Sequence, residues 1–480
     1  MPPDPAQPPD ATEPRMILLR GVNLLEAAGQ PPRRADVLIQ EGVLAWISPR
    51  STDLQSGLFN AAESTELAAS APRAETSGAA EALADALETA EWVDGADLWL
   101  GPPLVDPHSS LEDPLLGRAE TLESLAAAAA AGGYGTVALL PWGPDWRDRP
   151  ERLALGWPEP LELLLWGSFS QGGDDLELAR HGDQIAAGAV GLACGDQLPP
   201  VALLERGLRL AEMESHPVLL PPRDGSLGQQ GFVRERVEAL QAGWPVDPAA
   251  SEILPLELIL GLSELLPAAP LRLMNISTQE ALQRLARQST PPPASVHWWH
   301  LVADSSRLDP ADRGWRTVPS LGGPQDRQAL ITALADGLIQ AVAVHHQALD
   351  AEEQLLPLDQ RRPGLAGHGR VLPLLWQALV VEAGWRVEQL WQTLCWGPAA
   401  FLGLDPPTLQ PLSRRWILFD PEAPTPTGAG RGVSLAANLP AEIGSCRGGL
   451  VGSGLRGPAG WWAPGFPRPG TDRTARRPGR

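Results

Sequence analysis

The sequence contains no lysine, so all 37 of its basic residues are arginine. No carbamylated lysine can therefore bridge two metal ions in this protein. Cysteine is also scarce, because only Cys194, Cys395 and Cys446 are present, far apart and without a C-x-x-C motif. This spacing indicates neither a disulfide framework nor a zinc ribbon, and it fits a reducing cytoplasm.

Long apolar runs and an excess of positive charge are absent as well. No run reaches the length of a transmembrane helix. Residues 1–15 lack the basic and apolar regions of a signal peptide, and we expect a disordered leader there. The 480 residues carry a formal net charge of −21. Such an acidic surface argues against nucleic-acid partners and anionic membranes.

What is present is an alternation of strands and helices between two β-rich ends. The patterns predict strands at 16–22, 35–48 and 92–100, and an Ala-rich insertion at 51–90 with one helix near 78–89. After residue 403, strands are expected at 416–419 and 449–455. The middle predicts short buried strands at 136–141, 161–166, 189–193, 217–220, 271–276 and 341–344. Helices are expected at 121–131, 200–214, 250–266, 278–288, 325–336 and 367–382.

Repeated strand-then-helix units are the pattern of an α/β protein with a (β/α)8 barrel of the TIM type. We therefore predict a barrel with a small composite β-domain built from both ends of the chain. The predicted division is a leader at 1–15, β-domain segments at 16–102 and 404–456, the barrel at 103–403, and a disordered Pro/Gly/Arg tail at 457–480.

Several short segments, taken in order, resemble the dihydroorotase branch of the metal-dependent amidohydrolase superfamily. Residues 98–108, LWLGPPLVDPH, resemble the strand that enters the family's metal site, and 132–137, GGYGTV, resemble its Gly-Gly-aromatic-Thr-Thr-Val. Residues 275–280, NISTQE, are similar to its His-Val-Ser-Thr-x-Glu, and 438–440, NLP, to its closing Asn-Thr-Pro. Over 16–456, this resemblance implies the family's barrel with its split β-domain, and zinc-dependent hydrolysis of a cyclic amide in active members.

The departures from the family collect at its metal site. His108 stands where the family has its first zinc histidine. At the other five of six metal positions the family's ligands are replaced, here by Ser110, Cys194, Pro221, Asn275 and His345. Asp196 follows the fourth-strand position one or two residues late. Zinc sites need at least three protein ligands, so we expect no cofactor and no metal. His345, in place of the family's base aspartate, is the candidate catalytic residue.

Residues that bind substrate in the family differ too. Glu112 occupies the position of the family's arginine that binds the substrate carboxylate, and Trp142 occupies the position of a family asparagine. The remodelled pocket is predicted to include these residues, the former metal positions and His346. Two alternatives would leave the site catalytic. One is a rebuilt centre formed by His108, His345 and His346, and the other is Cys194 acting as a nucleophile. A small buried thiol is the simpler account of Cys194. The 18 tryptophans are scattered, which favours core packing over ligand stacking.

Three functions follow from the resemblance and its departures. The first is an inactive dihydroorotase-like protein of pyrimidine biosynthesis, acting in the cytoplasm as a structural or regulatory subunit. The family resemblance supplies aspartate carbamoyltransferase as its partner, and a homo-oligomer is also expected. The second is an active but diverged dihydroorotase or other cyclic amidase. The third is a small-molecule sensor that uses the remodelled barrel mouth.

Overall fold

The computed structural model describes two compact units. Of the described residues, those up to 102, those at 408–420 and those from 450 onward form the first; those at 103–407 and 421–449 form the second. The predicted leader, residues 51–72 of the insertion, Glu112 and the tail from 467 lie outside the described residues. The described ranges are 16–49, 73–111, 118–143, 146–154, 161–229, 231–307, 316–357, 360–424, 433–440, 446–457 and 459–466.

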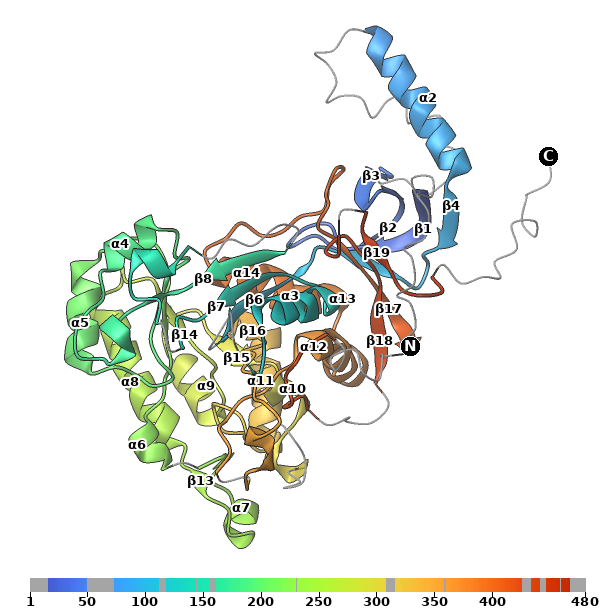
Figure 1. Cartoon of the computed structure of the whole chain (residues 1–480). Helices are drawn as coiled ribbons and strands as arrows, with labels where there is room; N and C mark the ends of the chain where they lie inside the picture. Colours follow the sequence, from blue (N-terminus) through green and yellow to red (C-terminus); the bar gives the residue numbers. More distant parts are fainter. Residues whose placement is uncertain are drawn as a thin grey trace, which may run out of the picture. The chain divides into compact units, whose positions relative to one another are not determined.

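Strands from both ends of the chain join in one sheet, which confirms the composite β-domain. The sheet has the order β19-β18-β17-β5-β1-β2-β3, and β4 also pairs with β1 (Figure 1). Helix α2 (Arg73–Thr89) begins five residues before the predicted start at 78. The strands are β1 (Met16–Leu24), β2 (Arg33–Gln40), β3 (Val43–Ile47), β4 (Glu91–Asp94), β5 (Trp99–Gly101), β17 (Ile417–Pro424), β18 (Arg447–Ser453) and β19 (Trp461–Trp462).

Turns divide two of the strands that the sequence predicts as single runs. Glu41 and Gly42 have φ values of 48° and 74°, the backbone of a tight hairpin turn, so 35–48 becomes β2 and β3. The Asp94 carboxylate accepts the Ala96 N–H at 3.1 Å, a local turn that separates β4 from β5. Apolar content alone does not reveal either break.

The predicted disorder of the tail is wrong for residues 459–466. Trp461 and Trp462 pair with β18 as strand β19. The Trp462 ring lies 5.5 Å from the Trp416 ring and stacks on Phe466 at 5.7 Å. Aromatic ring contacts therefore order a segment whose proline and glycine content suggests disorder.

The second unit is the predicted (β/α)8 barrel, with parallel strands. Strand β14 joins β15 through a bridge between Leu273 and Ala294. The ring closes where the His345 N–H donates to the His108 carbonyl at 3.1 Å, and the Ser110 N–H to the His346 carbonyl at 2.8 Å. In order, the strands are β6 (Leu104–Ser109), β7 (Tyr134–Leu139), β8 (Glu162–Leu165) continued by β9 (Gly167–Ser168), β10 (Leu192–Ala193), β11 (Val218–Leu220), β14 (Leu271–Leu273), β15 (Ser295–His297) and β16 (Ala341–Ala343).

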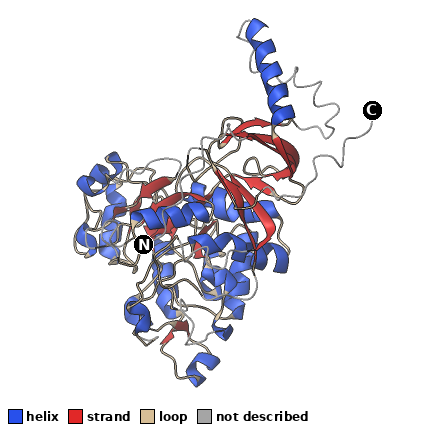
Figure 2. Cartoon of the chain, turned by 45° about the vertical axis from the view of Figure 1, so that its right-hand side comes forward, coloured by secondary structure: helices blue, strands red, loops and turns tan. Residues whose placement is uncertain are grey.

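Helices follow the barrel strands and cover them (Figure 2). Local sequence sets both ends of helix α3. Thr121 and Ser124 form a capping box at its start, and Gly132 ends the helix, as predicted for this glycine. The main helices are α3 (Leu122–Ala131), α5 (Val201–Leu210), α8 (Ala250–Leu265), α9 (Gln279–Leu285), α11 (Pro324–Ala335) and α12 (His368–Leu375). Shorter ones are α4 (His181–Ala186), α6 (Gly225–Gly228), α7 (Val237–Gln241), α10 (Trp299–Val302), α13 (Val387–Trp391) and α14 (Gly397–Phe401), and β12 (Val233–Arg234) pairs with β13 (Val246–Asp247).

The barrel interior is apolar below its mouth. Val105, Ala138, Leu219 and Ala341, from different strands, meet Phe401 of α14 in one buried cluster. This packing fixes the strand ends that carry the candidate site. Among the helices that the structure describes, none is both long and apolar enough to cross a membrane.

Candidate functional site

The ends of β6 and β16 bring two predicted site residues together. The Nδ1 atoms of His108 and His345 lie 3.0 Å apart, and His108 Nε2 lies 2.8 Å from the Ser295 hydroxyl. His345 has a φ of 47°, in the left-handed region where histidine is enriched among non-glycine residues. The barrel closure therefore forms a buried chain from His345 through His108 to Ser295.

Two further histidines extend this chain, giving a mouth histidine cluster of His108, His297, His300 and His345. The His297 ring lies 5.7 Å from His345 and 5.5 Å from His300, and its Nδ1 accepts the Trp299 N–H at 3.1 Å. Burial lowers the pKa of all four imidazoles, to about 4 for His300 and His345. The cluster is therefore neutral at physiological pH.

A second buried cluster, the outer polar group, consists of Asp106, Glu120, His346 and His368. Asp106 accepts the Val344 N–H at 3.0 Å, the His368 Nε2–H at 2.8 Å and the Ser109 hydroxyl. Gly132 allows the close approach of α3 to α12, since a Cβ there would collide with the His368 carbonyl. Asp106 thus ties β6 to β16 and to α12.

Glu120 supplies the second carboxylate of the outer polar group. It accepts the hydroxyls of Ser124 and Ser434, and the Leu435 N–H at 3.0 Å. Its Oε2 lies 3.4 Å from His346 Nε2. Burial by itself would raise the pKa of Glu120, but the contact with His346 and the two hydroxyls lower it to about 2. His346 therefore belongs to this group and not, as the sequence-based prediction had it, to the pocket.

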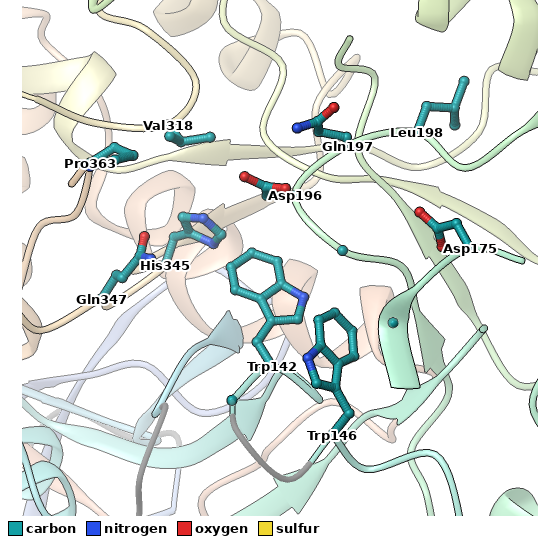
Figure 3. A pocket seen from close by; sticks show the side chains of 13 residues that line it. Trp142, Trp146, Asp175, Asp196, Gln197, Leu198, Val318, His345, Gln347 and Pro363 are labelled. Carbon is teal, nitrogen blue, oxygen red and sulfur yellow. The ribbon is translucent and has the colours of Figure 1, made fainter. Parts of the chain in front are cut away.

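A cavity of about 660 Å³, the mouth cavity, opens above the histidine cluster (Figure 3). A recess of about 20 Å³ adjoins it and shares Trp142, Asp196, Val318 and His345 with it. Pro221, Arg223 and Asn275 line the recess. The mouth cavity itself is lined by, among others, Trp142, Trp146, Asp175, Asp196, His345 and Gln347.

The other predicted residues take different places around the mouth. The Trp142 Nε1–H donates to the Cys194 carbonyl at 3.0 Å, and the Cys194 side chain is buried, which raises the pKa of its thiol. That environment supports a packing thiol and not an activated nucleophile. The Ser110 hydroxyl donates to the His346 carbonyl at 3.1 Å, across the strand closure.

The sequence-based prediction missed several residues of the site. Trp146 and Asp175 line the cavity from the segments that follow β7 and β9, and Ser295 belongs to β15, which was not predicted. Strand β15 has only three residues, two of them polar, so no apolar run marks it. The one available signal for Trp146 was its spacing of four residues after Trp142.

The donor set at the mouth does not fit the zinc pair that the resemblance implies. Among the described residues, no three histidine, cysteine, aspartate or glutamate side chains converge as a metal-binding group. Two of the family's ligand positions hold Pro221 and Asn275, and the Asn275 side chain makes no hydrogen bond with any described residue. We therefore assign no chemical step to a metal.

Solved structures share this fold over nearly the whole chain. The L-hydantoinase (dihydropyrimidinase) of Arthrobacter aurescens superimposes with a TM-score of 0.69 at 17% identity, covering 92% of this chain and 95% of that one. A D-hydantoinase (dihydropyrimidinase) from a Thermus species gives 0.65 at 16% identity, covering 91% and 93%. At this level of identity, the likeness establishes the barrel with its β-domain.

Curated relatives contradict one expectation drawn from the sequence. The dihydroorotase of Syntrophobacter fumaroxidans is 27% identical over 427 residues, 85% of this chain and 89% of its own length. The dihydroorotase of Thermus aquaticus is 27% identical over 425 residues, 85% and 90%. Since the dihydroorotase branch is metal-dependent, these relatives argue against the expectation of no cofactor. The replaced ligand positions were therefore insufficient grounds for that expectation.

The family itself follows from sequence similarity over about two thirds of the chain. No family model matches the chain. A probable dihydroorotase-like protein of Synechocystis is 32% identical over 369 residues, 69% of this chain and 82% of its own length. With the shared fold and the motifs in their order, this match confirms the resemblance. The chain belongs to the dihydroorotase-like family of the amidohydrolase superfamily, a family of cyclic-amide hydrolases.

Proposed function

We propose that this protein does not hydrolyse dihydroorotate and acts in the cytoplasm as a structural or regulatory subunit of pyrimidine biosynthesis. The observation that carries the proposal is the state of His345. This residue replaces the base aspartate of the family, and it is buried in a cluster whose imidazoles hydrogen-bond to one another, to Ser295 and to backbone groups.

The chemical difference lies in the charge that each base acquires. An aspartate that takes a proton from water becomes neutral, whereas His345 would become an imidazolium. Burial disfavours that charged form, and the neighbouring His300 and Arg223 disfavour it further, so that the pKa of His345 falls to about 4 even though the charge of Asp106 opposes the fall. His345 is therefore a poor acceptor for a proton during ring hydrolysis.

The charge around the mouth also opposes an anionic substrate. Dihydroorotate carries a carboxylate, for which the family provides an arginine. In this sequence that position is Glu112, and the described lining of the mouth cavity includes Asp175 and Asp196 but no arginine. Like charges in a partly buried pocket weaken binding. Substrate affinity and proton transfer are thus both impaired.

The test is a dihydroorotase assay in both directions, ring hydrolysis and cyclisation of carbamoyl aspartate, with and without added zinc. The purified chain is expected to show no turnover above buffer, while the Thermus aquaticus dihydroorotase serves as the active control. Turnover that disappears in His345→Ala would overturn the proposal. That outcome would favour the second function, an active but diverged cyclic amidase that uses the mouth cavity.

The subunit role has its own test. Family resemblance points to aspartate carbamoyltransferase, so the two proteins from the same genome are co-expressed with a tag on one of them. We expect co-purification in a fixed ratio, measured by light scattering after size exclusion, and scattering of the chain alone reports any homo-oligomer. Two separate peaks at micromolar concentrations would remove this partner.

A further inference from the structure

We propose that the mouth cavity binds a small organic cation, a molecule that carries an ammonium or guanidinium group. This inference goes beyond the subunit role and holds whether or not that role is correct. A volume of about 660 Å³ lies within the range of small-molecule sites, roughly 300–1,000 Å³. The lining therefore decides which ligand the cavity would accept.

Two indole rings form one wall of the cavity. Figure 3 shows Trp142 and Trp146 side by side, with Asp196 and Asp175 nearby. The Trp142 ring is held by its hydrogen bond to the Cys194 carbonyl. Trp146 packs against Gly173, where an added Cβ would come within 2.5 Å of the indole. Indole faces attract ammonium and guanidinium groups through their quadrupole.

The carboxylates of Asp175 and Asp196 contribute negative charge to the lining of the mouth cavity. Asp175 accepts the Ser170 hydroxyl at 2.8 Å, and the charge of Asp196 acts on Arg223 of the recess, so Asp175 is the carboxylate on which a bound cation would chiefly act. Burial raises the pKa of Asp175, the Ser170 hydrogen bond opposes this, and the charges of Asp174 and Asp196 raise it further. A bound cation would relieve this repulsion.

A separate observation indicates that the recess is built for a ligand atom. Asn275 is 3% exposed, yet neither its Oδ1 nor its Nδ2 has a hydrogen-bond partner among the described residues. Its φ of 55° lies in the left-handed region, so the backbone holds this amide at the recess at some cost. Arg223 also lines the recess, and its Nη1 likewise lacks a partner there. A polar end of the ligand would satisfy these groups.

This arrangement reverses the charge preference of the family's site. Dihydroorotate presents a carboxylate to an arginine in the family, whereas here two indoles and two carboxylates line the mouth cavity, and the guanidinium groups of Arg223 and Arg234 line only the recess. The expected ligand is therefore cationic at the mouth and offers a hydrogen-bonding atom to the recess. Choline represents the quaternary ammonium class, and its hydroxyl can accept a hydrogen bond from Arg223 in the recess. Agmatine represents the guanidinium class and, since its charged groups only donate hydrogen bonds, it tests the mouth of the cavity and the Asn275 oxygen.

The experiment is calorimetric titration of the full chain with agmatine and with choline, with dihydroorotate as the anionic comparison. We expect saturable binding of at least one cation and none of dihydroorotate. Asp175→Asn and Trp142→Ala should each weaken cation binding by up to roughly tenfold, because the first removes one screened charge and the second removes one aromatic contact. Asp174→Asn is the matched control, because it removes the same charge one residue outside the cavity lining.

Circular dichroism establishes that each variant is folded before it is titrated. Absence of binding of both cations to the folded wild-type chain would overturn the proposal. So would equal loss of affinity in Asp174→Asn and Asp175→Asn, because the effect would then come from general surface charge. An active dihydroorotase that still binds agmatine would reject the proposed function while leaving this inference standing.

Discussion

Two buried polar clusters lie beside the contact between the first and last barrel strands. One consists of neutral imidazoles, and the other contains carboxylates. The mouth histidine cluster bonds imidazole to imidazole and to Ser295, with no carboxylate in its hydrogen bonds. In the outer polar group, the carboxylate of Asp106 accepts a hydrogen bond from His368, and that of Glu120 lies in contact with His346. The first is neutral because burial outweighs everything else. The second keeps a charged carboxylate because donors converge on it.

His345 and His346 are adjacent in the sequence but belong to different clusters. His345 lines the mouth cavity, while His346 is directed to Glu120. The two histidines follow the end of β16, and the left-handed φ of 47° at His345 turns the chain there, so that the neighbouring side chains enter different clusters. In this barrel, the carboxylate–imidazole pairs hold elements together, whereas the residues at the mouth are available to a ligand.

The largest expected effect comes from breaking the outer polar group at Asp106. Asp106→Ala leaves the Val344 N–H, the Ser109 hydroxyl and His368 without their acceptor. The free energy of unfolding should fall by about 3–5 kcal/mol, the usual cost of breaking a buried pair. Urea unfolding followed by tryptophan fluorescence measures it. Asp106→Asn keeps one acceptor and should lose less; equal losses, or a loss below about 1 kcal/mol, would contradict the assignment.

The second largest expected effect is the contribution of Glu120 to the pH dependence of folding stability. Its pKa is lowered from 4.5 to about 2 in the folded chain, so its stabilisation is present above pH 4.5 and disappears as the pH falls through 2. Glu120→Gln should therefore cost roughly 3 kcal/mol at pH 7 and progressively less below pH 4.5. Thermal unfolding at several pH values compares the variant with Glu123→Gln, which changes an exposed carboxylate of the same helix start. Parallel curves for wild type and Glu120→Gln would rule out this role.

The smallest expected effect belongs to the mouth histidine cluster and lies in another pH window. The pKa of His345 falls from 6.5 to about 4 on folding, so the unfolded chain takes up the proton first and stability declines as the pH drops from 6.5 toward 4. His345→Asn, which tolerates the left-handed backbone, should remove about 2 kcal/mol of that decline between pH 6.5 and 5. Its stability at pH 8 should change by about 1 kcal/mol, one hydrogen bond. An unchanged slope in the acid range would show that folding does not lower the pKa of His345.

Much of the fold was predictable because its determinants are local. Alternating apolar runs and helical segments indicated the barrel, and the alanine-rich run at 121–131 with the glycines after it indicated α3. Strand β15 was missed because its three residues carry no apolar periodicity. Its place is set by hydrogen bonds to β16 and by burial, which are properties of the assembled barrel.

The site was predictable in its list of residues but not in its grouping. His108 and His345 meet because the first and last strands of a closed barrel are neighbours. His346 and Ser110 lie on the strand closure and contribute hydrogen bonds there. Trp146 and Asp175 reach the cavity from segments whose sequences carry no family motif.

The sequence by itself indicated the barrel, the composite β-domain and the residues of the predicted site, because periodicity, turn chemistry and residue identity are written along the chain. Tertiary structure decided which histidines hydrogen-bond to one another, how the pKa of Glu120 is lowered and what faces the mouth cavity. Those properties depend on burial and on distances between residues such as Asp106 and His368, which lie 262 positions apart in the chain and 2.8 Å apart in space. Electrostatic energies follow the spatial separation and the local dielectric, neither of which the order of residues specifies.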